Sequence, residues 1–74
     1  ANVLKIVQRT DAVVFYLDKY NIKIDEKMIN ILVEKYGPKL KFSQGVEPYI
    51  TLKMSSKDEM EIIRMIKELL TIIS

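Results

Sequence analysis

Cysteine and histidine are both absent from this 74-residue chain, and this absence most limits what it can fold into. Domains this short often depend on disulfides, a structural metal or a partner subunit, because a small core stabilises little. Without thiols or imidazoles, disulfide frameworks, zinc fingers, iron–sulfur clusters and imidazole metal sites are excluded. Stability must then come from an apolar core or from self-association, and 49% of the residues are apolar.

Composition and patterning indicate one soluble domain spanning residues 1–74. Charged residues make up 30% of the chain, and no apolar run approaches the roughly 18 residues of a membrane span. Residues 1–5 lack the layout of a secretory signal. We therefore expect a cytoplasmic protein that makes no membrane contact. The abundance of Ile, Lys and Glu is compatible with a thermophilic source.

The last third of the chain carries the clearest helical pattern. Ser56 and Glu59 fit a capping box, in which the serine bonds the third helical amide and the glutamate reaches back. Apolar residues then recur at helical spacing on an arc wider than the stripe of about 100° that one core-facing helix needs. These residues are Ile62, Ile63, Met65, Ile66, Leu69, Leu70, Ile72 and Ile73. We expect a long amphipathic helix with apolar surface left over.

A shorter helix and a β-hairpin are predicted ahead of this helix. Asp25 can cap a helix that ends at Gly37–Pro38, because glycine adopts a left-handed conformation and proline cannot continue the helix. Period-two alternation then runs on both sides of Gln44–Gly45, which predicts two antiparallel strands with one buried face. Pro48 is expected where the second strand begins, since a missing amide does least harm there. The predicted buried residues are Leu40, Phe42, Ile50, Leu52 and Met54.

The N-terminal third permits two interpretations. A three–four spacing from Val3 to Ile24 favours a helix that begins near Thr10 and ends at Asn21, and this is the element we expect. The run Val-Val-Phe-Tyr-Leu at residues 13–17 is also a good strand by propensity. The expected fold is α+β, with a small antiparallel β-hairpin sheet packed against two or three helices, the last of them long and amphipathic.

The sequence offers little support for catalysis, and we expect no enzyme activity and no cofactor or metal. A serine–lysine pair within Ser55–Lys57 occupies a predicted helix cap. The carboxylate pairs Asp25–Glu26 and Asp58–Glu59 open helices, where negative charge is favourable, and neither has a calcium-loop spacing. The two glycines do not form a glycine-rich, phosphate-binding loop.

Surplus apolar surface on the C-terminal helix is the strongest functional signal in the sequence. Large apolar patches are uncommon on monomers, and a twofold homodimer is the commonest way to bury one. We therefore expect a non-enzymatic interaction module that self-associates or serves as the small subunit of a larger complex. The predicted contact residues are Met65, Ile66, Leu69, Ile72 and Ile73.

The alternative is a small nucleic-acid-binding domain, similar to winged-helix proteins, in which the hairpin is the wing. The net charge of +2 permits such binding without requiring it. Lysines and an aromatic residue alternate with apolar residues in the hairpin, which is typical of sheets that contact single strands or phosphate backbones. The candidate contacts are Lys39, Lys41, Tyr49 and Lys53. Acidic residues at Asp25–Glu26 disfavour insertion of the central helix into a groove.

Two segments resemble known families. The strand–strand–helix pattern from Leu40 to Leu70 is similar to the small dimeric subunit of the KEOPS tRNA-modification complex, over less than half of the chain. That resemblance implies a dimerising scaffold with a strand in the N-terminal third. The run Gly45–Pro48, followed by a strand and a helix, is similar to the C-terminal domain of phosphohexomutases. Residues 42–46 read Phe-Ser-Gln-Gly-Val where that family has Arg-Pro-Ser-Gly-Thr, so phosphate binding is not implied.

Overall fold

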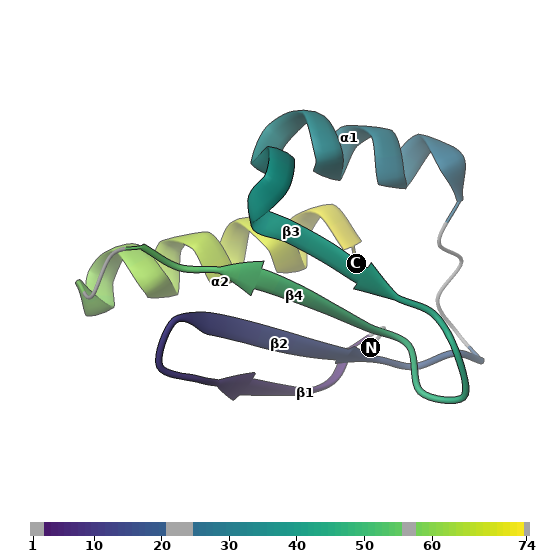
Figure 1. Ribbon diagram of the computed structural model, residues 1–74, viewed down its shortest axis with the longest axis horizontal. Coiled ribbons are helices and arrows are strands. Elements are labelled where there is room, and N and C mark those ends of the chain that lie inside the picture. Colours follow the sequence, from purple (N-terminus) through teal and green to yellow (C-terminus); the bar gives the residue numbers. More distant parts are fainter. Residues whose placement is uncertain (1–2, 21–24, 56–57, 74) are drawn as a thin grey trace.

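A computed structural model describes residues 3–20, 25–55 and 58–73. The chain runs through β1 (Val3–Gln8), β2 (Ala12–Leu17), α1 (Glu26–Tyr36), the 3-10 turn η1 (Gly37–Lys39), β3 (Leu40–Ser43), β4 (Tyr49–Lys53) and α2 (Glu59–Ile73). The strands form one sheet in the order β1-β2-β4-β3, with every neighbouring pair antiparallel (Figure 1). Because β4 lies between β2 and β3, the unit β2-α1-β3 is a split β-α-β motif. The fold is therefore α+β.

The N-terminal third forms a β-hairpin, so the helix that we expect there is wrong. Val13, Phe15 and Leu17 alternate into the core, and the residues between them face the other way. The Arg9 amide donates to the Ala12 carbonyl at 2.7 Å in the turn between the two strands. The sheet consequently has four strands rather than the two of a single hairpin. The predicted helix end at Asn21 lies outside the described residues.

The predicted cap at Asp25 and the predicted stop at Gly37 are confirmed. Asp25 caps α1, because its Oδ1 accepts a hydrogen bond from the Met28 amide at 2.8 Å. Gly37 ends the helix at a φ of 60°, a conformation that only glycine adopts without strain. At the start of α2, Asp58 Oδ1 accepts from the Met60 amide at 3.0 Å. The predicted cap Ser56 lies outside the described residues.

The predicted β3–β4 hairpin forms one side of the sheet, with β4 as a central strand. Its expected inward residues all pack in or against the hydrophobic core. Pro48 directly precedes β4, and its carbonyl accepts a hydrogen bond from the Leu17 amide at 3.0 Å.

The strand registers place two rows of side chains across all four strands on the covered face. The rows are Ile6–Phe15–Ile50–Phe42 and Gln8–Val13–Leu52–Leu40.

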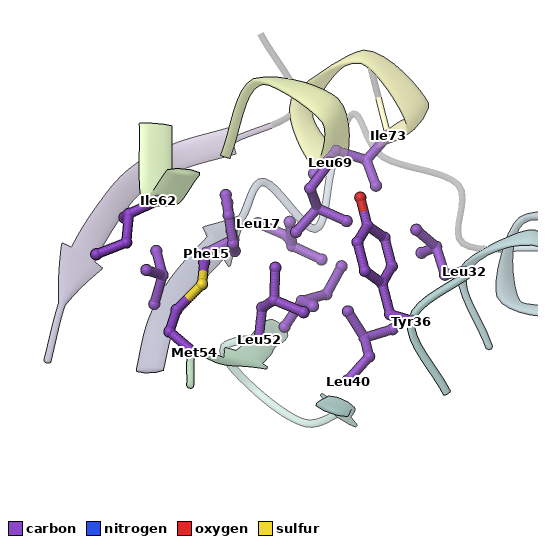
Figure 2. Close-up of a cluster of buried hydrophobic side chains, with 12 residues drawn as sticks. Phe15, Leu17, Leu32, Tyr36, Leu40, Leu52, Met54, Ile62, Leu69 and Ile73 are labelled. Carbon is purple, nitrogen blue, oxygen red and sulfur yellow. The ribbon is translucent and has the colours of Figure 1, made fainter. Parts of the chain in front are cut away.

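Both α-helices of the described chain cover this same face. Figure 2 shows Leu32 and Tyr36 of α1 meeting Leu69 and Ile73 of α2 above the sheet residues of the core. Leu32 and Leu69 are fully buried. Burying one such side chain stabilises the fold by about 1.5–3 kcal/mol relative to leaving it exposed. Within the described ranges, neither helix is long and apolar enough to cross a membrane.

Candidate functional site

The sheet face opposite the helices, which we call the open face, is covered by neither of them. Figure 1 shows α2 behind the sheet, so the viewer looks at the open face. Strand alternation and register determine which side chains lie on it. Its first row is Lys5–Tyr16–Tyr49–Ser43, its second is Val7–Val14–Thr51–Lys41, and Ala12 pairs with Lys53 in a third.

Aromatic rings lie at the middle of the first row. The ring centroids of Tyr16 and Tyr49 are 5.8 Å apart with an interplanar angle of 47°. Lys5 Nζ lies 4.7 Å from the Tyr16 ring centroid, within the range of a cation–π interaction. Three neighbouring strands thus contribute one continuous cation–aromatic–aromatic row. Tyr16 and Tyr49 are both partly exposed.

All charged side chains that the four strands place on the open face are positive. The four strands contain no aspartate or glutamate, and their three basic residues are Lys5, Lys41 and Lys53. Strand alternation places all three lysines on the open face, because the opposite positions are packed against the helices. A chain with a net charge of only +2 therefore concentrates positive charge on one surface.

One end of the open face is hollowed, and lysines surround the hollow. A pocket of about 260 Å³, which we call the basic hollow, is lined by Lys39, Lys41 and Lys53 and by one acidic residue, Asp11. Lys39 comes from η1, and the other two lysines come from β3 and β4. No residue in the described ranges forms an ion pair with any of these three lysines. Their ammonium groups are available to an anion.

The four residues predicted as nucleic-acid contacts gather on this surface. Lys39, Lys41 and Lys53 meet at the basic hollow, and Tyr49 lies in the aromatic row. The sequence interpretation missed Lys5 and Tyr16, because no strand was expected in the N-terminal third: Tyr16 lies in the segment predicted as helix, and Lys5 lies in β1 ahead of it. The alternation of apolar residues at 13, 15 and 17 is the signal that could have placed Tyr16 on the opposite face.

The residues predicted as a partner contact on α2 are mostly occupied within the chain. Leu69 and Ile73 are 0% and 1% exposed and lie in the core, so a partner cannot reach them without unfolding the domain. Met65, Ile66 and Ile72 are partly buried and pack against the same core. The most exposed apolar residues of α2 are instead Met60 and Ile63.

The helical side of the molecule carries a cluster of ionisable side chains around Tyr36, Arg64 and Glu68. No group of three or more His, Cys, Asp or Glu residues there could hold a metal ion. Arg64 bonds Glu68 at 2.9 Å and Glu61 at 3.2 Å on the surface of α2. The Tyr36 hydroxyl is buried, and it has no hydrogen-bond partner among the described residues. Burial raises the pKa of Tyr36, and the nearby Glu68 carboxylate raises it further against an opposing effect of Arg64.

The Tyr36 hydroxyl therefore stays protonated at neutral pH and is a poor nucleophile. The open face is the surface on which aromatic groups and unpaired charges converge.

Comparison with known proteins adds no assignment. Neither a protein-family model nor a curated protein nor a solved structure matches this chain.

Proposed function

We propose that this chain binds single-stranded nucleic acid on its open face, without catalysing a reaction. The observation that carries the proposal is the continuous row of Lys5, Tyr16 and Tyr49 across three strands. Unpaired bases stack on aromatic rings, and basic side chains track the phosphate backbone. Four-stranded sheets with aromatic residues on an uncovered face bind single-stranded RNA in this way.

The basic hollow supplies the phosphate contacts in this proposal. Tyr49 and Lys53 lie four residues apart on β4, which is about 13 Å along the strand. One extended nucleic-acid strand can therefore stack on the tyrosines and place its phosphates near Lys39, Lys41 and Lys53. The absence of acidic residues from all four strands reduces repulsion along this path, and Asp11 is the acidic residue that lines the basic hollow.

The geometry of the molecule suits a single nucleic-acid strand better than the groove of a duplex. Both described α-helices lie on the covered face, and α1 begins at Glu26 after its cap Asp25, two residues whose charges repel phosphates. The β3–β4 hairpin is not a free wing, because β4 also pairs with β2 along five residues. The flat surface between the tyrosines and the basic hollow is the part that supports recognition.

Fluorescence anisotropy with a labelled ten-nucleotide oligouridine tests the proposal. We expect saturable binding that a duplex of equal length competes for poorly. If three lysines neutralise three phosphates, log K falls against log salt with a slope of about −2, since each contributes about 0.7 for single strands. Lys41→Ala should reduce the steepness by about 0.7. Lys27→Ala on α1 removes the same charge from the other side and should change nothing.

Either of two results contradicts the proposal. The first is no binding to oligouridine at low salt. The second is binding whose affinity and salt slope are the same for Lys41→Ala and Lys27→Ala, because such binding does not use the open face.

A second candidate function is self-association through the outer side of α2. Met60 and Ile63 favour it, because they lie one turn apart and are 78% and 49% exposed. Light scattering on a size-exclusion column over a concentration series would then give twice the mass of 8.7 kDa. Ile63→Glu should return the mass to that of one chain, whereas Val33→Glu on α1 should not. A single-chain mass for the unmodified protein at high concentration would exclude this candidate.

A further inference from the structure

A second hollow opens at the opposite end of the open face. This hollow, which we call the end pocket, has a volume of about 400 Å³. That is within the range of roughly 300–1,000 Å³ typical of small-ligand sites. Its walls are mainly apolar and come from separate parts of the chain. The apolar lining residues are Leu4, Tyr16, Leu17, Tyr20, Val46 and Pro48.

Three of these side chains are largely exposed to solvent, although burial is favourable for apolar groups. Leu4 is 67% exposed, Tyr20 is 86% exposed and Val46 is 81% exposed. They come from β1, from the segment after β2 and from the β3–β4 loop, yet they line one hollow. Single exposed apolar residues are ordinary, but several gathered at a concave surface are typical of a binding site.

Local geometry fixes two of these residues at the pocket. A register shift between Val3 and Lys5 leaves Leu4 as an extra residue opposite β2. Such a β-bulge redirects a side chain out of the regular alternation. After β2, the Tyr20 amide donates to Asp18 Oδ1 at 3.0 Å, and this turn places Tyr20 at the pocket.

We propose that the end pocket binds one unpaired base of the nucleic-acid strand that lies on the open face. This inference rests on the proposed function. Its support is continuity, because Tyr16 and Lys5 belong both to the aromatic row and to the pocket lining. A strand that stacks on Tyr49 and Tyr16 therefore reaches the pocket with its next base, and Tyr20 is a further aromatic residue of the pocket lining.

The charges at the rim distinguish the end pocket from the basic hollow. Lys5 and Lys19 are balanced there by Asp18 and Glu47, so the rim attracts no net phosphate charge. A base rather than a phosphate is the part of the strand that suits it. Across the ranges that the structure describes, no side chain bonds to the Glu47 carboxylate. A free carboxylate accepts a hydrogen bond from an exocyclic amino group, which favours cytosine over uracil.

Affinity for the labelled oligouridine tests the pocket through two variants on exposed positions. Loss of one stacking ring should weaken binding about tenfold in Tyr20→Ala. Val46→Asp should also weaken binding, and its control Val33→Asp introduces the same charge on α1 without effect. Circular dichroism verifies that each variant is folded. The salt slope should stay unchanged in Tyr20→Ala, because no phosphate contact is lost.

Base preference tests the part assigned to Glu47. Oligouridines that each carry one cytosine at a different position are compared with the unsubstituted strand. One hydrogen bond of ordinary strength corresponds to about three- to tenfold tighter binding, and we expect it at a single position. Glu47→Ala should abolish that preference. Equal affinity for all strands would overturn the assignment to Glu47.

The outcomes separate the two proposals. If the unmodified chain binds no oligouridine, the proposed function and the end pocket both fail. If Tyr49→Ala and Lys41→Ala weaken binding while Tyr20→Ala and Val46→Asp do not, only the end pocket is overturned. A tenfold loss in Tyr20→Ala with an unchanged salt slope supports it.

Discussion

The two faces of one strand, β2, carry different parts of the molecule's chemistry. Phe15 faces the helices and is fully buried, whereas its neighbour Tyr16 lies on the open face beside Lys5. The covered face holds the helices to the sheet by burial of apolar groups. On the open face, the backbone pairing of the sheet already fixes the positions of the side chains. Substitutions of its exposed side chains should therefore leave the contacts between the helices and the sheet in place.

Polarity alone does not separate the two faces. Val14 lies at the centre of the open face, and only 6% of it is exposed although no described helix covers it. Its row neighbours are Val7 and Thr51, and Lys5 and Lys53 lie diagonally from it, opposite Tyr16 and Ala12. The aliphatic stems of lysines commonly cover apolar surface while their ammonium groups stay in water. The difference between the faces thus lies in which groups remain reachable, not in which residue types are present.

Truncation of Phe15 should cause the largest loss of stability. It is the most direct test of the difference between the covered face and the open face. Phe15→Ala deletes a fully buried ring and should cost about 3–5 kcal/mol in free energy of unfolding, most of what a domain this small has. Tyr16→Ala should cost less than about 1.5 kcal/mol. Urea unfolding followed by circular dichroism measures both. Equal losses in the two variants would remove the distinction between the faces.

Tyr49 should show the opposite profile to Phe15. Tyr49→Ala should lower affinity for oligouridine by about 1–3 kcal/mol, the usual value for one stacked base. Tyr49→Phe keeps the ring and should retain most of the affinity. Anisotropy titrations give these values, and thermal melts verify that the variants stay folded. An equal loss in both variants would mean that the hydroxyl, and not the ring, makes the contact.

Loss of the cap on α1 should affect stability alone. Asp25→Ala removes the acceptor of the Met28 amide and should cost about 1 kcal/mol. Because α1 lies on the covered face, oligouridine affinity at a temperature where the variant is folded should not change. Urea unfolding and anisotropy on the same sample test this. A loss of affinity would show that the helix layer and the open face are coupled.

The smallest expected effect concerns the buried Tyr36 hydroxyl. Its pKa is raised above the ordinary value of 10.0, mainly by burial. Since the unfolded chain loses this proton first, the contribution is intact below pH 10 and is lost as pH rises through the higher folded value. Tyr36→Phe should be as stable at pH 7 or more stable by up to about 1 kcal/mol, because an unpaired hydroxyl is removed.

Urea unfolding of both proteins between pH 7 and pH 11 measures this difference. The stability advantage of Tyr36→Phe should grow above pH 10. A constant difference across that range would show that Tyr36 has the same pKa in the folded and unfolded chain.

Short sequence patterns predicted the structural features that neighbouring residues determine. The cap at Asp25, the stop at Gly37 and the alternation around Gln44–Gly45 each depend on residues close in sequence. The segment 13–17 is different, because its apolar residues fit both a helical and a strand spacing. Pairing of β2 with β4, more than 30 residues away, decides in favour of the strand.

The same non-local pairing explains the site and the apolar arc of α2. Lys39, Lys41 and Lys53 could be placed together from hairpin alternation, whereas Lys5 required knowledge of β1. The end pocket joins residues 4, 20 and 46, a combination that no sequence spacing indicates. The arc of α2 exceeds what a two-stranded hairpin can cover, but the four-stranded sheet and α1 bury Leu69 and Ile73 completely.

The β-bulge at Leu4 also determines how wide the sheet can become. An edge strand with a regular register presents a row of free backbone groups that can recruit a further strand and start a fibril. In β1 the register is interrupted between Val3 and Lys5, and such bulges generally bend a strand and increase its twist. The opposite edge, β3, is only four residues long. Deletion of Leu4 would repair the ladder without moving any other residue to the wrong face, and it would turn a closed edge into one open to aggregation.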